Sequence, residues 1–148
     1  MAALLQNRIL IAGILGWANA QILKTIIYTV MNRSFRLERL VGDGGMPSAH
    51  SATVTAIAVS SGIMYGFNSF EFAISCILAI IVMHDAMGVR RVTGKQSEVI
   101  NELMDIFVAE HPEEMFSDEK LKELVGHTPL QVAAGFLLGV VTALIYCM

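Results

Sequence analysis

Charged side chains are scarce in this sequence: 16% of its 148 residues are Asp, Glu, Lys or Arg, whereas 55% are hydrophobic. Soluble domains carry about 25% charged residues, and the mean hydropathy here is +0.61. The composition therefore excludes an ordinary soluble globular domain and indicates one integral membrane domain.

Cysteine and clustered basic charge are also scarce. The two cysteines, Cys76 and Cys147, lie in apolar runs, so we expect small buried thiols rather than a disulfide or a metal pair. Nine of the thirteen acidic residues fall between 98 and 123, and the net charge is −3, which excludes a basic nucleic-acid-binding surface. The apolar run after Arg8 is too long for a signal peptide and contains Lys24, so we interpret it as a retained span.

Four apolar runs cover residues 9–31, 51–67, 70–87 and 129–147. Because a helix of about 20 residues crosses the hydrocarbon core, we predict an all-α membrane bundle with about four transmembrane helices. The second run is short and rich in Ser, Thr, Ala and Gly, which favours close helix packing and predicts a place in the bundle centre.

A polar insertion, residues 88–128, separates the third and fourth runs. The segment 96–109 has an apolar stripe at helical spacing opposite acidic side chains, which predicts an amphipathic helix. The stripe consists of Val99, Leu103, Ile106 and Phe107. Further on, Ser117 is a typical N-cap and Gly126 a typical helix stop, so a short helix is expected between them.

The stretch 44–51 places two glycines, a proline, two serines and a histidine directly before an apolar run. Gly44 and Gly45 allow close backbone approach to a ligand, and Pro47 suits the first turn of a helix. The N–H groups of that turn attract anions, and His50 would stand beside them with Ser48. The stretch thus predicts a phosphate pocket, although a glycine-rich turn in which Ser48 only caps the helix fits the same residues.

A second histidine stands at a helix start, because His127 precedes Thr128 and Pro129. Lys24 lies inside the first apolar run, where a lysine is costly unless it faces protein, water or an anion. We therefore expect it in the site, with snorkelling toward the interface as the alternative.

Asp85 closes the third run and is followed closely by Arg90 and Arg91. An acidic group inside a span requires a partner. These residues indicate either part of the anion site or a structural ion pair at a helix end.

Four crossings would place residues 32–50 and 88–127 on one side of the membrane and both termini on the other. Six flanking basic residues lie on that side, against Arg8 on the other: Arg33, Arg36, Arg39, Arg90, Arg91 and Lys95. Positive charge favours the cytoplasmic side, so we expect the polar loops and the site there, in an integral protein of the cell membrane.

Two imidazoles among cationic groups predict phosphoryl transfer without a metal. One histidine would attack phosphorus, the other would protonate the leaving alkoxide, and cations with helix N–H groups would hold the phosphoryl oxygens. The rival is a metal site formed by His50, His84, Asp85 and His127, but their spacing matches no compact metal motif. We therefore expect neither a metal nor a cofactor.

Six stretches resemble the divergent branch of the type 2 phosphatidic acid phosphatase superfamily, which is related to acid phosphatases and vanadium haloperoxidases. They are residues 21–24, 44–51, 84–91, 94–96, 101–103 and 126–135. The resemblance implies a hydrolase that acts on a phosphorylated lipid or isoprenoid in the membrane through a phosphohistidine.

The resemblance also assigns roles. Pro47-Ser48-Ala49-His50 matches the superfamily's Pro-Ser-Gly-His motif, which makes His50 the general acid and Ser48 a phosphate ligand. His127 matches the nucleophile, and Lys24 matches the lysine of the first motif. The arginine of that motif would have to come from Arg33 or Arg36.

The chain departs from the family pattern at three places, and the first is the spacing of the first motif, which lacks its Arg-Pro seven residues after Lys24. Gln131 occupies the position of an aspartate that supports the nucleophile; Asp85 and Glu102 are the carboxylates that would take that role. The usual Ser-Arg before the nucleophile is missing, so Arg90 or Arg91 would have to serve. These departures favour a second hypothesis, a degenerate member that binds anionic lipid head groups or acts as a membrane assembly partner. A transporter is a third, and a homo-oligomer stays open.

Overall fold

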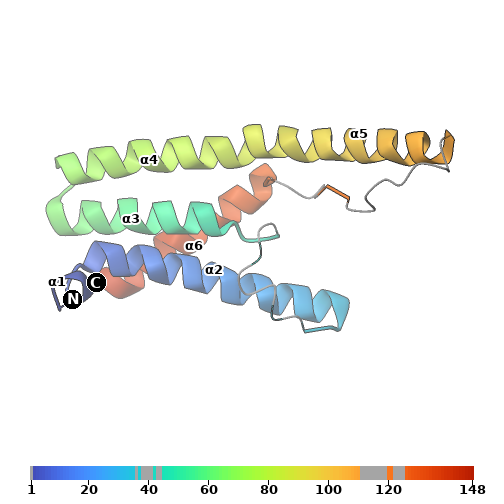
Figure 1. The fold of residues 1–148 in the computed structure, drawn as a ribbon. Helices are drawn as coiled ribbons and strands as arrows, with labels where there is room; N and C mark the ends of the chain where they lie inside the picture. The colour runs from blue at the N-terminus through green and yellow to red at the C-terminus, as the bar shows by residue number, and fades with distance from the viewer. Residues whose placement is uncertain (1, 36, 38–41, 43–44, 111–119, 122–125) are drawn as a thin grey trace.

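The computed structural model describes residues 2–35, 37, 42, 45–110, 120–121 and 126–148, and in these residues it contains helices and no strands. Figure 1 shows a bundle with one helical arm extending from it. The helices are α1 (Ala2–Leu5), α2 (Arg8–Asn32), α3 (Ala49–Tyr65), α4 (Phe70–Met87), α5 (Val89–Glu110) and α6 (Pro129–Cys147). The predicted all-α membrane bundle is confirmed.

Short polar side chains set where the long helices begin. Asn7, Ser48, Ser69 and Thr128 each accept a hydrogen bond from a backbone N–H of the first turn of α2, α3, α4 and α6, respectively. Such caps satisfy N–H groups that have no partner within the helix. The four helices therefore coincide closely with the four apolar runs.

Helix α3 lies at the bundle centre, as its composition predicted, and contacts α2, α4 and α6. Its buried side chains are almost all small, and four serines of the chain are 2% exposed or less: Ser48, Ser51, Ser60 and Ser61. Small side chains let helix backbones approach closely. Close contact between helix backbones, rather than packing of large apolar side chains, therefore stabilises the core.

Glycines of the outer helices make the closest approaches to α3. A Cβ at Gly139 of α6 would lie 2.5 Å from the carbonyl oxygen of Ala52, and one at Gly16 of α2 would lie 2.8 Å from the same oxygen. A Cβ at Gly135 would clash with the carbonyl oxygen of Ser48. The spacing Gly135-x-x-x-Gly139 is a helix-packing motif that the sequence interpretation passed over.

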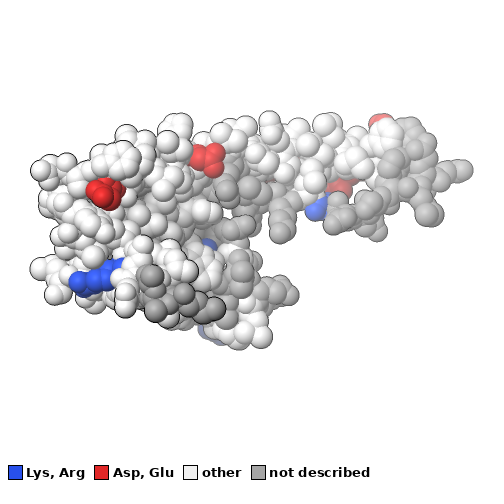
Figure 2. Space-filling view, turned by 60° about the vertical axis from the view of Figure 1, so that its left-hand side comes forward, with Lys and Arg blue, Asp and Glu red and all other residues white. Residues whose placement is uncertain are grey.

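The outer helix faces are apolar and uncovered. On α4, for example, Ile74, Ile77, Ile80 and Ile81 are each more than half exposed. Figure 2 shows few Lys, Arg, Asp or Glu side chains on the face it presents. These surfaces suit contact with lipid.

Among the described residues, three helical stretches are long and apolar enough to cross a membrane: residues 8–32, the continuous stretch 70–110, and residues 129–147. Helix α3 has 17 residues, a length of about 25 Å, and is shorter than each of these three stretches. Both chain termini lie at the same end of the bundle (Figure 1), as an up-and-down arrangement of the four long helices requires.

Helix α5 begins at Val89, seven residues before the predicted amphipathic helix, and nearly continues the axis of α4. It contacts only α4 among the described helices. The side chain of Asn101 bonds both backbone groups of Leu121, at 2.9 Å each, and Lys120 forms a 2.7 Å ion pair with Asp105. Of the predicted short helix after Ser117, only Lys120, Leu121 and Gly126 are described, and none of them is helical.

Candidate functional site

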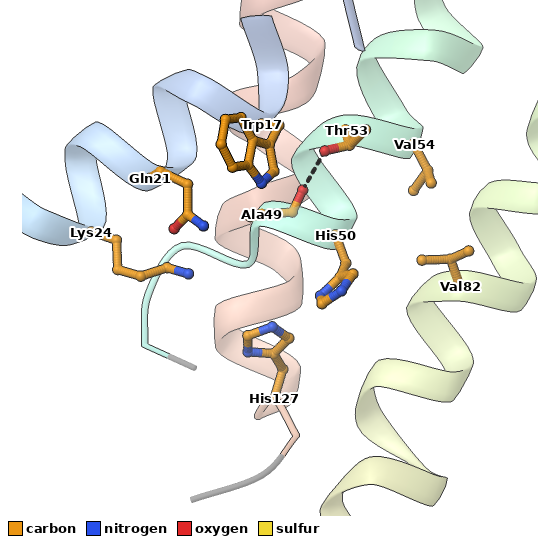
Figure 3. A pocket seen from close by; sticks show the side chains of 9 residues that line it. All are labelled: Trp17, Gln21, Lys24, Ala49, His50, Thr53, Val54, Val82 and His127. Carbon is orange, nitrogen blue, oxygen red and sulfur yellow. Dashed lines mark hydrogen bonds between the residues drawn. The ribbon is translucent and has the colours of Figure 1, made fainter. Parts of the chain in front are cut away.

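A cavity of about 350 Å³ opens between α2, α3, α4 and the start of α6. Polar and apolar side chains line it: Trp17, Gln21, Lys24, Ala49, His50, Thr53, Val54, Val82 and His127 (Figure 3). Helices α2 and α4 do not contact each other but both pack on α3. The cavity therefore has α3 as its floor and the two outer helices as its walls.

The two predicted histidines meet at this cavity. The ring centroids of His50 and His127 are 5.8 Å apart, and the ring planes are inclined by 59°. His50 is the second residue of α3, and His127 lies two residues before α6 begins. Two helix N-termini, each with a positive dipole end, thus converge where the imidazoles face each other.

His127 is anchored through its backbone and its ring. Its N–H donates to the carbonyl oxygen of Ala86 at 2.9 Å, which ties the start of α6 to the last turn of α4. Its Nδ1 lies 3.3 Å from Oε1 of Gln131. The histidine is 4% exposed, so its orientation is set by protein contacts.

The same Gln131 oxygen accepts a hydrogen bond from the N–H of Thr128 at 2.9 Å, as one half of a capping box. A backbone N–H can only donate, so the amide atom it meets is the oxygen. That oxygen has a second lone pair, and Nδ1 of His127 must then be the protonated ring nitrogen. Nε2 is therefore the candidate nucleophilic atom.

Lys24 is 6% exposed and lines the cavity. Its ammonium donates to the carbonyl oxygen of Gly42 at 3.4 Å. Gly45 has a φ of 81°, and a Cβ there would lie 3.2 Å from Cγ of Lys24, so this glycine allows the loop to cross the lysine stem. The lysine points into protein, which is not the snorkelling arrangement.

Two residues of the 44–51 stretch are placed differently from expectation. Pro47 precedes the cap of α3 rather than opening its first turn. Ser48 is fully buried: its N–H donates to the carbonyl oxygen of Gln131 at 3.0 Å, and its Oγ accepts from Ser51. This hydroxyl caps α3, and Ser48 is not among the residues that line the cavity.

Two predicted carboxylates are not among the described residues that line the cavity. Asp85 is half-buried on α4 next to Ala86, outside the lining residues. Glu102 is exposed on α5, which makes no contact with α6. Gly44 and the side chains of Arg90 and Arg91 lie outside the described part of the structure. Within that part, no three His, Cys, Asp or Glu side chains gather as metal ligands.

Gln21 and Trp17 line the cavity but received no role from the sequence. Together with Lys24 they stand at positions i, i+4 and i+7 of α2, which share one helix face. This shared helix face could have been recognised from the sequence spacing alone. An amide and an aromatic ring inside an apolar run, however, do not by themselves distinguish a ligand site from helix packing.

The fold and the site define a helical membrane protein in which two histidines meet at one cavity, near the starts of two helices. The chain belongs to the Divergent PAP2 family, whose model matches residues 5–142. It is 39% identical over 150 residues to a Bacillus subtilis (strain 168) protein named as the uncharacterized membrane protein YuiD, covering 96% of this chain and 95% of the relative. No solved structure matches significantly.

Proposed function

We propose that this protein is an integral-membrane phosphatase that hydrolyses a lipid phosphate or an isoprenoid diphosphate through a phosphohistidine. The observation that carries the proposal is the 5.8 Å separation of the His50 and His127 rings at a cavity that also holds buried Lys24. A reactive contact needs about 3 to 3.5 Å between nucleophile and target atom, and a proton transfer needs a hydrogen bond of about 2.6–3.2 Å. Two rings with centroids this close can each bring a nitrogen into contact with the same phosphoryl group.

The reaction proceeds in two steps. Nε2 of His127 attacks phosphorus, the ester P–O bond breaks, and His50 gives its proton to the leaving oxygen. Water then attacks the phosphohistidine, His50 takes a proton from it, and inorganic phosphate leaves. Lys24 and the dipoles of α3 and α6 stabilise the negative charge on the phosphoryl oxygens in both steps.

The site opens on the cytoplasmic side in this proposal. In the sequence, six basic residues flank the apolar runs on the site side and Arg8 flanks them on the other, which favours that orientation under the positive-inside rule. Accessibility of a cysteine introduced at exposed Lys95 to an impermeant thiol reagent in sealed cells tests it: labelling only after permeabilisation supports the orientation.

Phosphate release by the purified protein tests the mechanism. With a phosphorylated lipid in detergent micelles and EDTA present, the wild-type protein should release phosphate, and His127→Ala and His50→Ala should abolish the release. His84→Ala is the matched control, because His84 is exposed on α4 outside the cavity lining. Release that survives His127→Ala contradicts the mechanism.

A second candidate function follows from Gln131. This residue stands where the family pattern has a carboxylate, and its amide cannot balance the charge of an imidazolium. A degenerate member would use the same cavity to bind anionic lipid head groups without turnover. Orthovanadate, which mimics the phosphoryl transition state, distinguishes the two functions. Vanadate binding that requires His50 and His127, together with phosphate release, supports the enzyme. Binding to anionic lipid vesicles without vanadate binding and without phosphate release supports the head-group binder.

A further inference from the structure

Gln21 is a buried amide in the cavity that the reaction above does not use. It is 6% exposed and lines the cavity between Trp17 and Lys24, and Figure 3 shows its side chain directed to the same space as that of Lys24. Its Oε1 has no hydrogen-bond partner in the described part of the structure. A buried acceptor without a donor is unfavourable, so this atom points to a ligand that supplies one.

The position along α2 indicates which part of the ligand Gln21 meets. Lys24 marks the phosphoryl end, beside the 42–45 loop. Trp17 lies seven residues back along the same helix face, about 10 Å deeper at 1.5 Å per residue. Gln21 stands between them, and Val54 and Val82 line the cavity without offering a polar group. The amide thus faces the alcohol portion of a substrate rather than its phosphorus.

Ionised phosphoryl oxygens are acceptors, so they cannot satisfy the Gln21 oxygen. An isoprenoid chain without hydroxyl groups or a fully acylated glycerol offers no donor near the ester bond. A lipid phosphate that carries a free hydroxyl beside the phosphoester offers one. We propose that Gln21 determines specificity by accepting a hydrogen bond from such a hydroxyl, so that the preferred substrates are hydroxylated lipid phosphates of the lysophosphatidate type; this inference rests on the proposed phosphatase function.

Two substrates that differ by one oxygen test the proposal. One is 1-oleoyl-glycerol 3-phosphate, and the other is its analogue without the 2-hydroxyl, oleoyl-propanediol phosphate. The wild-type protein should show a kcat/KM at least about tenfold higher for the hydroxylated lipid, because a site that hydrogen-bonds a hydroxyl discriminates against its absence. Gln21→Met, similar in size but without an acceptor, should bring the ratio close to one while turnover of the deoxy lipid is kept.

Thr53→Val is the matched control. Thr53 also lines the cavity with a hydroxyl, but that hydroxyl donates to the carbonyl oxygen of Ala49 at 2.7 Å (Figure 3), so its removal should leave the tenfold ratio in place. If Gln21→Met does not fold, Gln21→Asn, which withdraws the amide by one methylene, should lower the ratio as well.

Equal kcat/KM values for the two lipids in the wild-type protein overturn the proposal, as does a preference that persists without the Gln21 amide. Absence of phosphate release from both lipids instead contradicts the proposed function. In that case the non-hydrolysable phosphonate analogues of the two lipids still decide the role of Gln21 through their relative binding affinities. A hydroxyl preference of about tenfold in binding supports it, and equal affinities overturn it.

Discussion

Replacing Gln131 by glutamate should increase phosphate release. In the native site the Gln131 oxygen lies 3.3 Å from Nδ1 of His127, and in the proposed reaction positive charge would develop on this ring as Nε2 bonds to phosphorus. A neutral hydrogen bond contributes about 0.5–1.5 kcal/mol and one to a charged group about 1.5–3 kcal/mol. The difference of about 1 to 1.5 kcal/mol corresponds to about a tenfold rise in kcat.

The substitution preserves the local structure, because glutamate is a preferred partner in the capping box that Thr128 forms with residue 131. The assay is phosphate release at saturating substrate, since the added negative charge also weakens substrate binding and would mask the gain in kcat/KM. Gln131→Met, which removes the oxygen, should lower kcat and destabilise the start of α6 by about 1 kcal/mol. A folded Gln131→Glu protein with an unchanged or lower kcat would refute the reasoning on imidazolium stabilisation.

Three further outcomes are expected. Gly139→Ala should lower the free energy of unfolding in detergent by about 1–3 kcal/mol, because the added methyl group overpacks against Ala52. Ala133→Leu, on the exposed face of α6, is the control and should leave this free energy unchanged. Equal effects of the two substitutions would contradict the close contact of Gly139 with α3. Lys24→Met should reduce vanadate affinity at least about tenfold in isothermal titration, as expected for the loss of a charged contact, and unaltered affinity would remove Lys24 from the site. Ser69→Ala should cost about 1 kcal/mol of stability by removing the α4 cap, measured as a lower thermal midpoint; an unchanged midpoint would show that the cap contributes nothing.

The helices could be predicted because hydropathy and capping agree at their ends. Ser48 and Thr128 each precede an apolar run, and the structure starts a helix directly after each. The start of α5 could not be predicted, because the residues from 89 to 95 are mostly polar and include a glycine, which is typical of a loop. In the structure the backbone hydrogen bonds continue across this segment: the N–H of Gly88 donates to the carbonyl oxygen of His84, and the N–H of Val92 donates to that of Gly88.

The meeting of His50 and His127 was anticipated from chain topology, but their separation was not. It depends on how closely α6 approaches α3, which Gly135 and Gly139 decide through backbone contacts. The buried position of Ser48 depends on the same approach, because its N–H bonds the carbonyl oxygen of Gln131. Sequence patterns name groups at helix ends but do not give the distance between helices.

The position of Lys24 within α2 determines where an amphiphile would have to stand to react. Eight residues of this helix follow the lysine, so the helix continues about 12 Å past Lys24. Under the proposed function, the reaction would take place below the end of α2. A reactant resting in the bilayer would meet the imidazoles at the depth of its own head group, without being lifted into water, and only the released phosphate would need an aqueous exit.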